Sequence, residues 1–391
     1  MPADLHGFAK KLAAAKCPED VFGVLETRSP DLKRRDLAGA YRRLVLVVHP
    51  DRYSGPDVAL ANSCFTQLGI LREQAERKIA AGTYGDLRPI QPPPPPRPAF
   101  EEQIVKTPKT EYVVQRLLAE GDLADVYLAS AGKGRRARAY AFKLAMHPGD
   151  NDLLEHEAKI LGAIEAERVR RQDRGSPKRG YQFIPRIADT FVLRGSSRTN
   201  RRVNVIEYAD GYVSLAQISA AYPTGLDFRD VVWIFKRMLY ALWFVHTELK
   251  IVHGAIVPPH VLVHPTEHGA KLVDWCYAVT DWPKRATHVR AISKTHRAYY
   301  PPEIFAKAPP SPATDIYMAA KCVLTLLGGN HETNVIPTAV PTPIRAFLQG
   351  CMLASPAKRP NDAGALHEEF DDLLLRVVGK PTYRPLAMPE K

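Results

Sequence analysis

The stretch IVHGAIVPPHVLVHP, residues 251–265, decides how the rest of this 391-residue chain is interpreted. It follows a long segment with helical apolar periodicity, residues 231–246, and it ends in alternating apolar residues that predict a strand. Two histidines, His253 and His260, lie in it, but no carboxylate occurs between residues 249 and 266. The absence of an acidic side chain restricts the acid–base chemistry that this loop can perform.

The composition is that of an ordinary globular protein, with 45% hydrophobic and 25% charged residues. The length suffices for two or three domains, each with its own core. We expect no membrane span, because the most apolar long stretch is interrupted by Lys236 and Arg237, and the N-terminus has no apolar signal core. The 5 widely separated cysteines predict reduced thiols in a cytoplasmic protein rather than disulfides or a zinc site.

The net charge of +12 comes from 54 Lys and Arg residues against 42 Asp and Glu residues. The excess gathers in three runs, at residues 133–139, 168–180 and 194–202. Such runs are compatible with a nucleic-acid surface. The simpler interpretation, which we prefer, is that they are solvated loops of a basic protein.

A proline-rich stretch, PIQPPPPPRPAF at residues 89–100, predicts the main domain boundary. Consecutive prolines favour an extended, semi-rigid rod and cannot join a helix or a sheet interior. We therefore expect a helical domain at 1–88, a linker at 89–110, a second globular unit at 111–378 and a tail at 379–391. The prolines could also dock into an SH3-like groove, but a spacer is the preferred interpretation.

Two helices joined by a short loop are predicted in the first domain. Ser29 and Pro30 form a helix-start signal, and apolar residues follow at helical spacing: Leu37, Tyr41, Leu44 and Val48. A second stripe begins after the loop: Phe65, Leu68, Leu71, Ala75 and Ile79. Burial of the facing stripes predicts an all-α antiparallel hairpin, with the tripeptide His49-Pro50-Asp51 at its tip.

The segments VFGVL at 21–25 and AYRRLVLVVHPDR at 40–52 resemble a J-domain, the module with which co-chaperones engage DnaK-type chaperones. The resemblance covers residues 18–85. It implies that His49, Pro50 and Asp51, with Arg42 and Arg43 of the basic helix, contact the chaperone and stimulate its ATPase. The alternative is a helical hairpin that carries the tripeptide by chance.

Residues 111–145 alternate as in a twisted antiparallel sheet, and a helix, NDLLEHEAKILGAI at 151–164, follows. Later segments have fixed order and spacing: KLVDWCYA at 271–278, YYPPEIF at 299–305, ATDIYMAAKCVLTLLGG at 313–329 and CMLASPAKRPNDAGAL at 351–366. Together with residues 251–265 they resemble a protein kinase over residues 111–375. We therefore expect a bilobal α+β fold, with an antiparallel N-lobe at 111–210 and a helical C-lobe at 211–378.

The resemblance implies a nucleotide site formed by residues of both lobes. The expected ATP contacts are Gly121, Val126, Ala141, Lys143, Glu157, Glu207 and Ala209, with Ile206 as gatekeeper. Lys143 would pair with Glu157, for which Glu155 is the alternative, and Asp274 would bind one Mg²⁺ ion. The resemblance also implies structural roles for Asp315 and for an ion pair between Glu303 and Arg359. Only Gly121 remains of the family's three loop glycines, with Ala119 and Ala124 in the outer places.

The loop at 251–265 departs from the family pattern at the positions that perform catalysis. Gly254, Ala255 and His260 stand where the family has Arg, Asp and Asn. Ala255 has no heteroatom, and general-base assistance is worth roughly 10²–10⁴-fold in rate. His260 is a poor ligand for Mg²⁺, which prefers oxygen. The pattern predicts a pseudokinase, although His260 or His253 could act as a substitute base.

Three functions remain open from the sequence. The first is a co-chaperone adaptor that recruits a DnaK-type ATPase while its kinase-like domain binds ATP or a client protein. The second is a divergent Ser/Thr protein kinase with slow or unusual phosphoryl transfer. The third is a nucleic-acid-binding regulator, which would use the arginine-rich runs.

Overall fold

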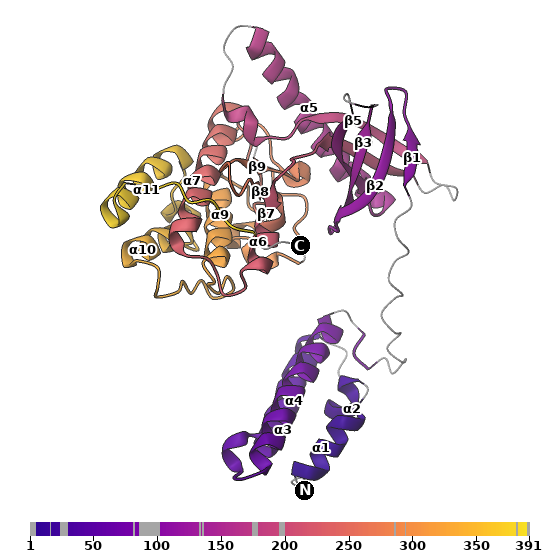
Figure 1. Cartoon of the computed structure of the whole chain (residues 1–391), viewed down its shortest axis with the longest axis vertical. Helices are drawn as coiled ribbons and strands as arrows, with labels where there is room; N and C mark the ends of the chain where they lie inside the picture. The colour runs from indigo at the N-terminus through magenta and orange to yellow at the C-terminus, as the bar shows by residue number, and fades with distance from the viewer. Residues whose placement is uncertain are drawn as a thin grey trace. The chain divides into compact units, whose positions relative to one another are not determined.

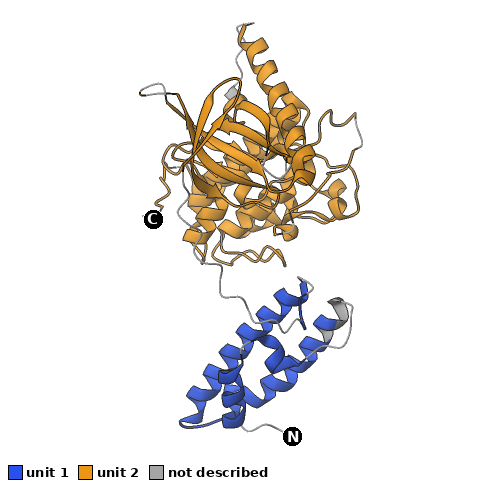
Figure 2. Cartoon of the chain, turned by 90° about the vertical axis from the view of Figure 1, so that its right-hand side faces the viewer, with its two compact units in different colours: residues 1–99 blue, residues 100–391 orange. Residues whose placement is uncertain are grey.

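The computed structural model describes residues 5–15, 17–23, 30–80, 83–85, 102–132, 134, 137–173, 179–194, 200–284, 287–293, 295–380 and 382–388. The chain divides into two compact units, residues 1–99 and residues 100–391, which Figure 2 shows in different colours. Residues 89–101 of the expected linker lie outside the described residues. So do residues 133, 135–136, 174–178 and 195–199 of the arginine-rich runs.

Helices build the first unit because its apolar residues recur at every third or fourth position. These are α1 (Leu5–Ala14), α2 (Pro18–Phe22), α3 (Pro30–Val48) and α4 (Asp57–Ala80), with a 3-10 turn, η1 (Pro50–Arg52). Figure 1 shows α3 and α4 side by side as a hairpin, and the two predicted stripes meet in one core. Leu37, Val48 and Leu68 are fully buried or nearly so. Helix α1, which the sequence analysis did not single out, adds Phe8 and Leu12 to this core.

A buried carboxylate joins the two ends of the first unit. Glu19 of α2 forms an ion pair with Lys78 of α4, and its Oε1 also accepts the backbone N–H of Gly85 at 3.0 Å. Burial alone would raise the pKa of Glu19, but the hydrogen bonds from Lys78 and Gly85 outweigh it and lower the pKa. The short helix α2 is therefore fixed to the end of α4 by charge as well as by apolar packing.

The second unit begins with an antiparallel sheet whose strands alternate between buried and exposed residues. Its strands are β1 (Gln103–Lys106), β2 (Glu111–Ala119), β3 (Ala124–Ala131), β4 (Arg138–Ala145), β5 (Ile187–Arg194) and β6 (Asn200–Glu207), in the order β1-β2-β3-β4-β6-β5. Strand β1 lies inside the range that we expected to be linker, 89–110. Four residues are too few for a periodic signal, so the sequence did not reveal it. Helix α5 (Asn151–Asp173) packs against β5 and β6.

The rest of this unit is mainly helical (Figure 1). The helices are α6 (Leu215–Ala221), α7 (Phe228–Phe244), α8 (Pro302–Phe305), α9 (Pro312–Leu326), α10 (Thr342–Cys351) and α11 (Ala363–Val378). A small antiparallel sheet joins β7 (Val213–Ser214), β8 (Val261–Val263) and β9 (Ala270–Leu272). Short helical turns are η3 (Pro148–Asp150), η4 (Arg179–Phe183), η5 (Val245–Leu249), η6 (Pro258–His260), η7 (Trp275–Tyr277), η8 (Arg297–Tyr299) and η9 (Pro356–Lys358).

Helix α9 lies at the centre of the helical lobe, with nearly all of its side chains buried. It packs against α6, α7 and α10, and it contributes Met318 and Leu324 to the main core. Among the helices of the described residues, neither α9 nor any other is long and apolar enough to cross a bilayer.

Residues 382–388 pack onto the helical lobe. Leu386 is buried, and its backbone N–H donates to the carbonyl of Pro265 at 3.0 Å. Arg384 makes a two-pronged ion pair with Asp230 of α7, with N···O distances of 2.5 and 3.1 Å. The segment 382–388, which we had expected to be a simple tail, is therefore a strap across α7 and the β8–β9 connection.

A buried ion pair fixes the start of α8 to the segment before α11. Arg359 Nη2 lies 2.5 Å from Glu303 Oε2, and both side chains are almost completely buried. Glu303 Oε1 also accepts the Thr314 hydroxyl at 3.1 Å, and Arg359 donates to the Ala313 carbonyl at 3.0 Å. The structure thus brings together the two residues that the sequence analysis expected to pair.

Removal of Arg359 should strongly destabilise the second unit. In Arg359→Met the Glu303 carboxylate stays buried without its cation, and the loss of one partner of such a pair typically costs about 3–5 kcal/mol. Urea unfolding followed by tryptophan fluorescence measures this, because all 4 tryptophans lie in residues 233–282. The control is Lys358→Met, at the exposed neighbouring position. Equal stabilities for the two variants would contradict the structural role of the pair.

Candidate nucleotide site

The site is built around the ammonium group of Lys143, on the central strand β4. Its Nζ lies 3.0 Å from Glu157 Oε1, 3.1 Å from Asp274 Oδ2 and 3.3 Å from Cys276 Sγ. Burial alone would lower the pKa of Lys143, but the negative charges of Asp274 and Glu157 outweigh it and raise the pKa. Lys143 is therefore a permanent cation in the interior.

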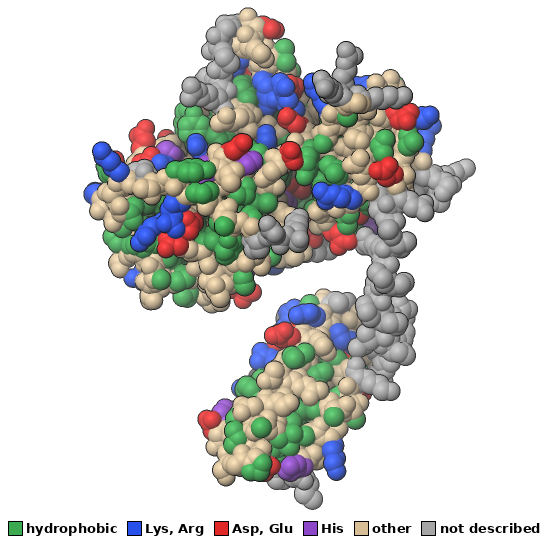
Figure 3. Space-filling view, in the orientation of Figure 1, with side chains coloured by type: hydrophobic (Ala, Val, Ile, Leu, Met, Phe, Trp, Pro, Cys, Tyr) green, Lys and Arg blue, Asp and Glu red, His purple; other side chains and the backbone are tan. Residues whose placement is uncertain are grey.

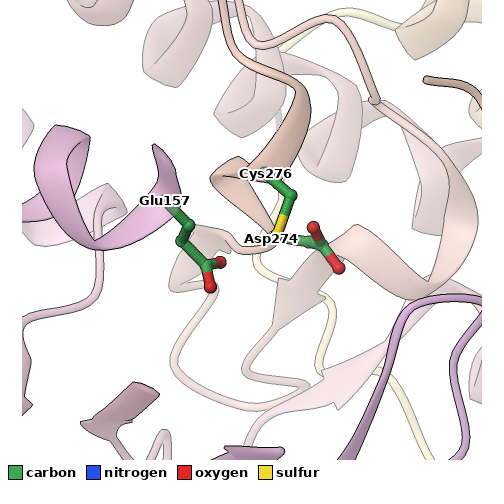
Figure 4. A group of neighbouring side chains, drawn as sticks. All are labelled: Glu157, Asp274 and Cys276. Carbon is green, nitrogen blue, oxygen red and sulfur yellow. The ribbon is translucent and has the colours of Figure 1, made fainter. Parts of the chain in front are cut away.

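Figure 4 shows Glu157 on α5 and Asp274 and Cys276 on the segment after β9, close to one another. Their ligand atoms lie within 4.8 Å of one another, as in a metal site. Lys143 Nζ is within hydrogen-bonding or ion-pair distance of all three residues, however, so the cation that this group holds is the lysine itself. Burial, together with the charge of Asp274, raises the pKa of the Cys276 thiol well above its usual value. Cys276, like the other 4 cysteines of the chain, is free.

Glu157 has donors for both of its oxygens. Besides Lys143, Oε1 accepts the backbone N–H of Trp275 at 3.1 Å, and Oε2 accepts Asn204 Nδ2 at 2.9 Å. Asn204 lies on β6 and also donates to the Leu154 carbonyl at 2.8 Å. The sequence analysis missed Asn204. The signal was present, since one amide stands in an otherwise apolar buried run, residues 203–206.

Asp274 offers one oxygen for a further ligand. Its backbone is left-handed, with φ 64° and ψ 72°, and its Oδ2 faces Lys143. Burial alone would raise the pKa of Asp274, but the charges of Lys143 and His260 lower it, so the carboxylate stays ionised. Its Oδ1 is buried and has no hydrogen-bond partner among the described residues. An ionised oxygen without a donor fits the Mg²⁺ ion that the fold implies.

A second carboxylate, Asp315 of α9, organises the loop at 251–260. It accepts the backbone N–H groups of His253 and Gly254 at 2.7 and 2.8 Å, and it lies 2.8 Å from His246 Nε2. His253 Nε2 bonds the Val273 carbonyl at 3.1 Å, and its ring packs on Trp275. His253 is fully buried, and burial lowers its pKa to about 4. These contacts support a structural role for His253 rather than that of a substitute base.

Ala255 lies at the position where the resemblance to protein kinases implies an acidic side chain. Ala255 is fully buried, and its carbonyl lies 2.9 Å from His260 Nδ1. A carbonyl only accepts, so Nδ1 of His260 carries a proton. The other ring nitrogen, Nε2, lies 3.5 Å from Asp274 Oδ2. His260 is thus the histidine of this loop whose ring faces Asp274.

The remaining expected ATP residues lie along the sheet and the segment that follows it. Val126 of β3 pairs in register with Lys143 of β4, and Ala141 pairs with Ile206 of β6. Glu207 is exposed at the end of β6, and the carbonyl of Ala209 accepts the N–H of Tyr212 at 3.2 Å. Gly121 lies in the turn between β2 and β3, where an added Cβ would be 2.6 Å from the Ala124 carbonyl oxygen. A glycine is therefore required at this turn.

In the first unit the tripeptide lies at the tip of the hairpin. His49 packs edge-on against Phe65 of α4, with ring centroids 5.6 Å apart, and its Nδ1 accepts the Asp51 N–H at 3.4 Å. Asp51 is exposed. Arg42 and Arg43 are exposed on α3, and Arg42 Nε bonds the Ala38 carbonyl at 3.2 Å.

Comparison with known proteins bears on the second unit. No protein-family model matches the chain. Over 76 residues, 19% of the chain, it is 33% identical to casein kinase II subunit alpha' of Saccharomyces cerevisiae, and it spans only 22% of that protein's length. The crystal structure of a kinase domain, PF14_0431, matches 67% of this chain and 95% of its own, with a TM-score of 0.52 and 14% identity. The second unit has a protein-kinase-like fold. Residues 1–99 are too few to carry a match of this length, so it falls mainly on this unit.

The burial of His253 should make the kinase-like unit sensitive to acid. The unfolded state binds a proton near pH 6.5 but the native state only near pH 4, so native stability falls as the pH drops through this window. The full effect is about 3 kcal/mol. His253→Gln should flatten the dependence in urea unfolding between pH 7 and pH 4, whereas a variant of the exposed His288 should not. Parallel pH curves for wild type and His253→Gln would refute this.

Proposed function

We propose that the protein is a J-domain co-chaperone adaptor whose kinase-like unit binds ATP and Mg²⁺ without efficient phosphoryl transfer. The observation that carries the second half is a contrast between the residues around Lys143 and those of the loop at 251–260. Lys143 has both of its expected carboxylate partners, Glu157 and Asp274. Ala255, in contrast, offers only a backbone carbonyl where a base is needed. Positioning and charge neutralisation supply much of phosphoryl transfer, so nucleotide binding can persist without the base.

The nucleotide-binding half rests on Lys143 and Asp274. Lys143 is a fixed cation beside the position that phosphates take in this fold, and Asp274 Oδ1 is free to hold Mg²⁺. When bound, the ion would neutralise phosphate charge. Cys276 next to Asp274 does not compete for magnesium, because a protonated thiol is a poor ligand for a hard cation.

The chaperone-binding half rests on the hairpin of the first unit. Its loop presents the exposed Asp51 at the tip, while Arg42 and Arg43 are exposed on α3. Arg52 and Tyr53 bond the carbonyls of Leu46 and Val47, which fixes the loop to the end of α3. A loop held in this way can present Asp51 to a partner with little loss of conformational freedom.

The first test is stimulation of a DnaK-type ATPase by the full-length protein. Asp51→Asn should stimulate the ATPase roughly tenfold less than wild type, or more weakly still. Hydrogen bonds to a charged group are worth about 1.5–3 kcal/mol. The control is Asp57→Asn, a carboxylate at the start of α4 that pairs with His6 at 3.1 Å. If Asp51→Asn stimulates as well as wild type, or if neither stimulates, the co-chaperone function is wrong.

The second test is the thermal stability of the second unit with ATP, with and without Mg²⁺. A ligand at 100 times its dissociation constant stabilises the folded state by about 2.7 kcal/mol. Asp274→Asn should lose the magnesium-dependent increment, whereas Lys271→Met, on β9, should keep it. An equal shift for wild type and Asp274→Asn would contradict the proposed metal site.

A divergent kinase is the second candidate, and His260 is the observation that favours it. Its Nε2 faces Asp274 at 3.5 Å, and its ring is partly exposed. Transfer of labelled phosphate from ATP to protein, lost in both Lys143→Met and His260→Ala, would establish it and displace the pseudokinase proposal. A nucleic-acid function would need a surface on which Lys and Arg gather. On the face shown in Figure 3, Lys and Arg are interspersed with Asp and Glu in both units.

A further inference from the structure

One contact in the kinase-like unit joins two segments that both border the proposed nucleotide site. Asp122 follows Gly121 in the turn between β2 and β3. Its Oδ2 accepts the Ser293 hydroxyl at 2.5 Å, and its Oδ1 accepts the Thr295 hydroxyl at 3.0 Å. The two hydroxyls belong to the segment from Asp274 to Glu303, 171 and 173 positions further along the chain.

The setting of Ser293 shows that this contact is part of a built site. Ser293 is 4% exposed, and its backbone N–H donates to the hydroxyl of Tyr300 at 3.2 Å. Its Oγ also lies 3.1 Å from His296 Nδ1. Tyr300 itself is buried in the main core. Because a buried hydroxyl without partners is costly, these contacts together hold Ser293 under the turn.

The carboxylate of Asp122 is ionised in this position. Burial alone would raise its pKa, but the hydrogen bonds from Ser293 and Thr295 outweigh it and lower the pKa. A negative charge next to Gly121 is unfavourable for a ligand whose phosphates approach the same turn. The two hydroxyls hold this carboxylate, and with it the turn, in the observed position.

We propose that Asp122, Ser293 and Thr295 form a latch that holds the β2–β3 turn against the segment that carries the two hydroxyls and hinders the entry of nucleotide into the proposed site. The effect on nucleotide rests on the ATP binding proposed above. The latch itself is a contact within the chain and can be measured without any nucleotide. The latch joins a carboxylate, Asp122, to the uncharged hydroxyls of Ser293 and Thr295. Substitution can therefore remove a hydroxyl without changing the charge, or the charge without removing a hydroxyl.

The experiment uses the full-length protein and hydrogen–deuterium exchange of the amides in residues 119–124 and 287–300, without nucleotide. Thr295→Val removes one hydroxyl at nearly constant volume and leaves the Asp122 charge in place, whereas Thr295→Ser restores the hydroxyl. Asp122→Asn weakens the acceptor. The matched control is Asp125→Asn on β3, whose carboxylate accepts the Tyr127 hydroxyl at 3.5 Å.

The latch predicts roughly tenfold faster exchange in both regions for Thr295→Val and Asp122→Asn, equivalent to about 1.4 kcal/mol. Thr295→Ser and Asp125→Asn should exchange like wild type. ATP with Mg²⁺ should also bind Thr295→Val several-fold more tightly than wild type. Unchanged exchange in Thr295→Val would overturn the latch.

Two further outcomes separate the latch from simpler explanations. If ATP binds more tightly to Asp122→Asn but not to Thr295→Val, charge repulsion alone is responsible, and the latch is wrong as a gate. If exchange rises as predicted but neither wild type nor any variant binds ATP, the latch stands, whereas the proposed nucleotide binding fails.

Discussion

The buried ammonium of Lys143 is the constraint on which the kinase-like unit depends. It is held by carboxylates from two different elements, Glu157 on α5 and Asp274 after β9. Two carboxylates this close, one of them fully buried, would repel each other without a cation between them. The lysine therefore joins the sheet, the long helix and the helical lobe at one point. Any ligand that enters the site must share this cation or replace its partners.

A second carboxylate, Asp315, explains how the chain keeps a kinase-like architecture while the loop at 251–260 departs from the family's sequence pattern. Asp315 holds the loop through the backbone N–H groups of His253 and Gly254, which does not depend on the loop's side chains. The loop can therefore carry Ala255 and His260 without losing its shape. In the function proposed above, nucleotide binding and catalysis can therefore be separated, because they would depend on different residues.

Much of the fold could be predicted from the sequence because its signals are local. The apolar stripes of α3 and α4 predicted the hairpin, and the alternation around Lys143 predicted the sheet. The partners of the site residues could not be predicted in this way. Asn204 meets Glu157 across 47 positions and Cys276 meets Lys143 across 133, and no spacing rule connects such positions. Asp122 and Ser293 are the extreme case, since only the folded lobes bring them together.

The strap formed by residues 382–388 is part of the packed structure of the helical lobe. Leu386 and Arg384 anchor it to Pro265 and Asp230, beside the strand that follows the catalytic-loop position. Trimming by a carboxypeptidase, or an affinity tag placed directly after these residues, would therefore disturb the helical lobe itself.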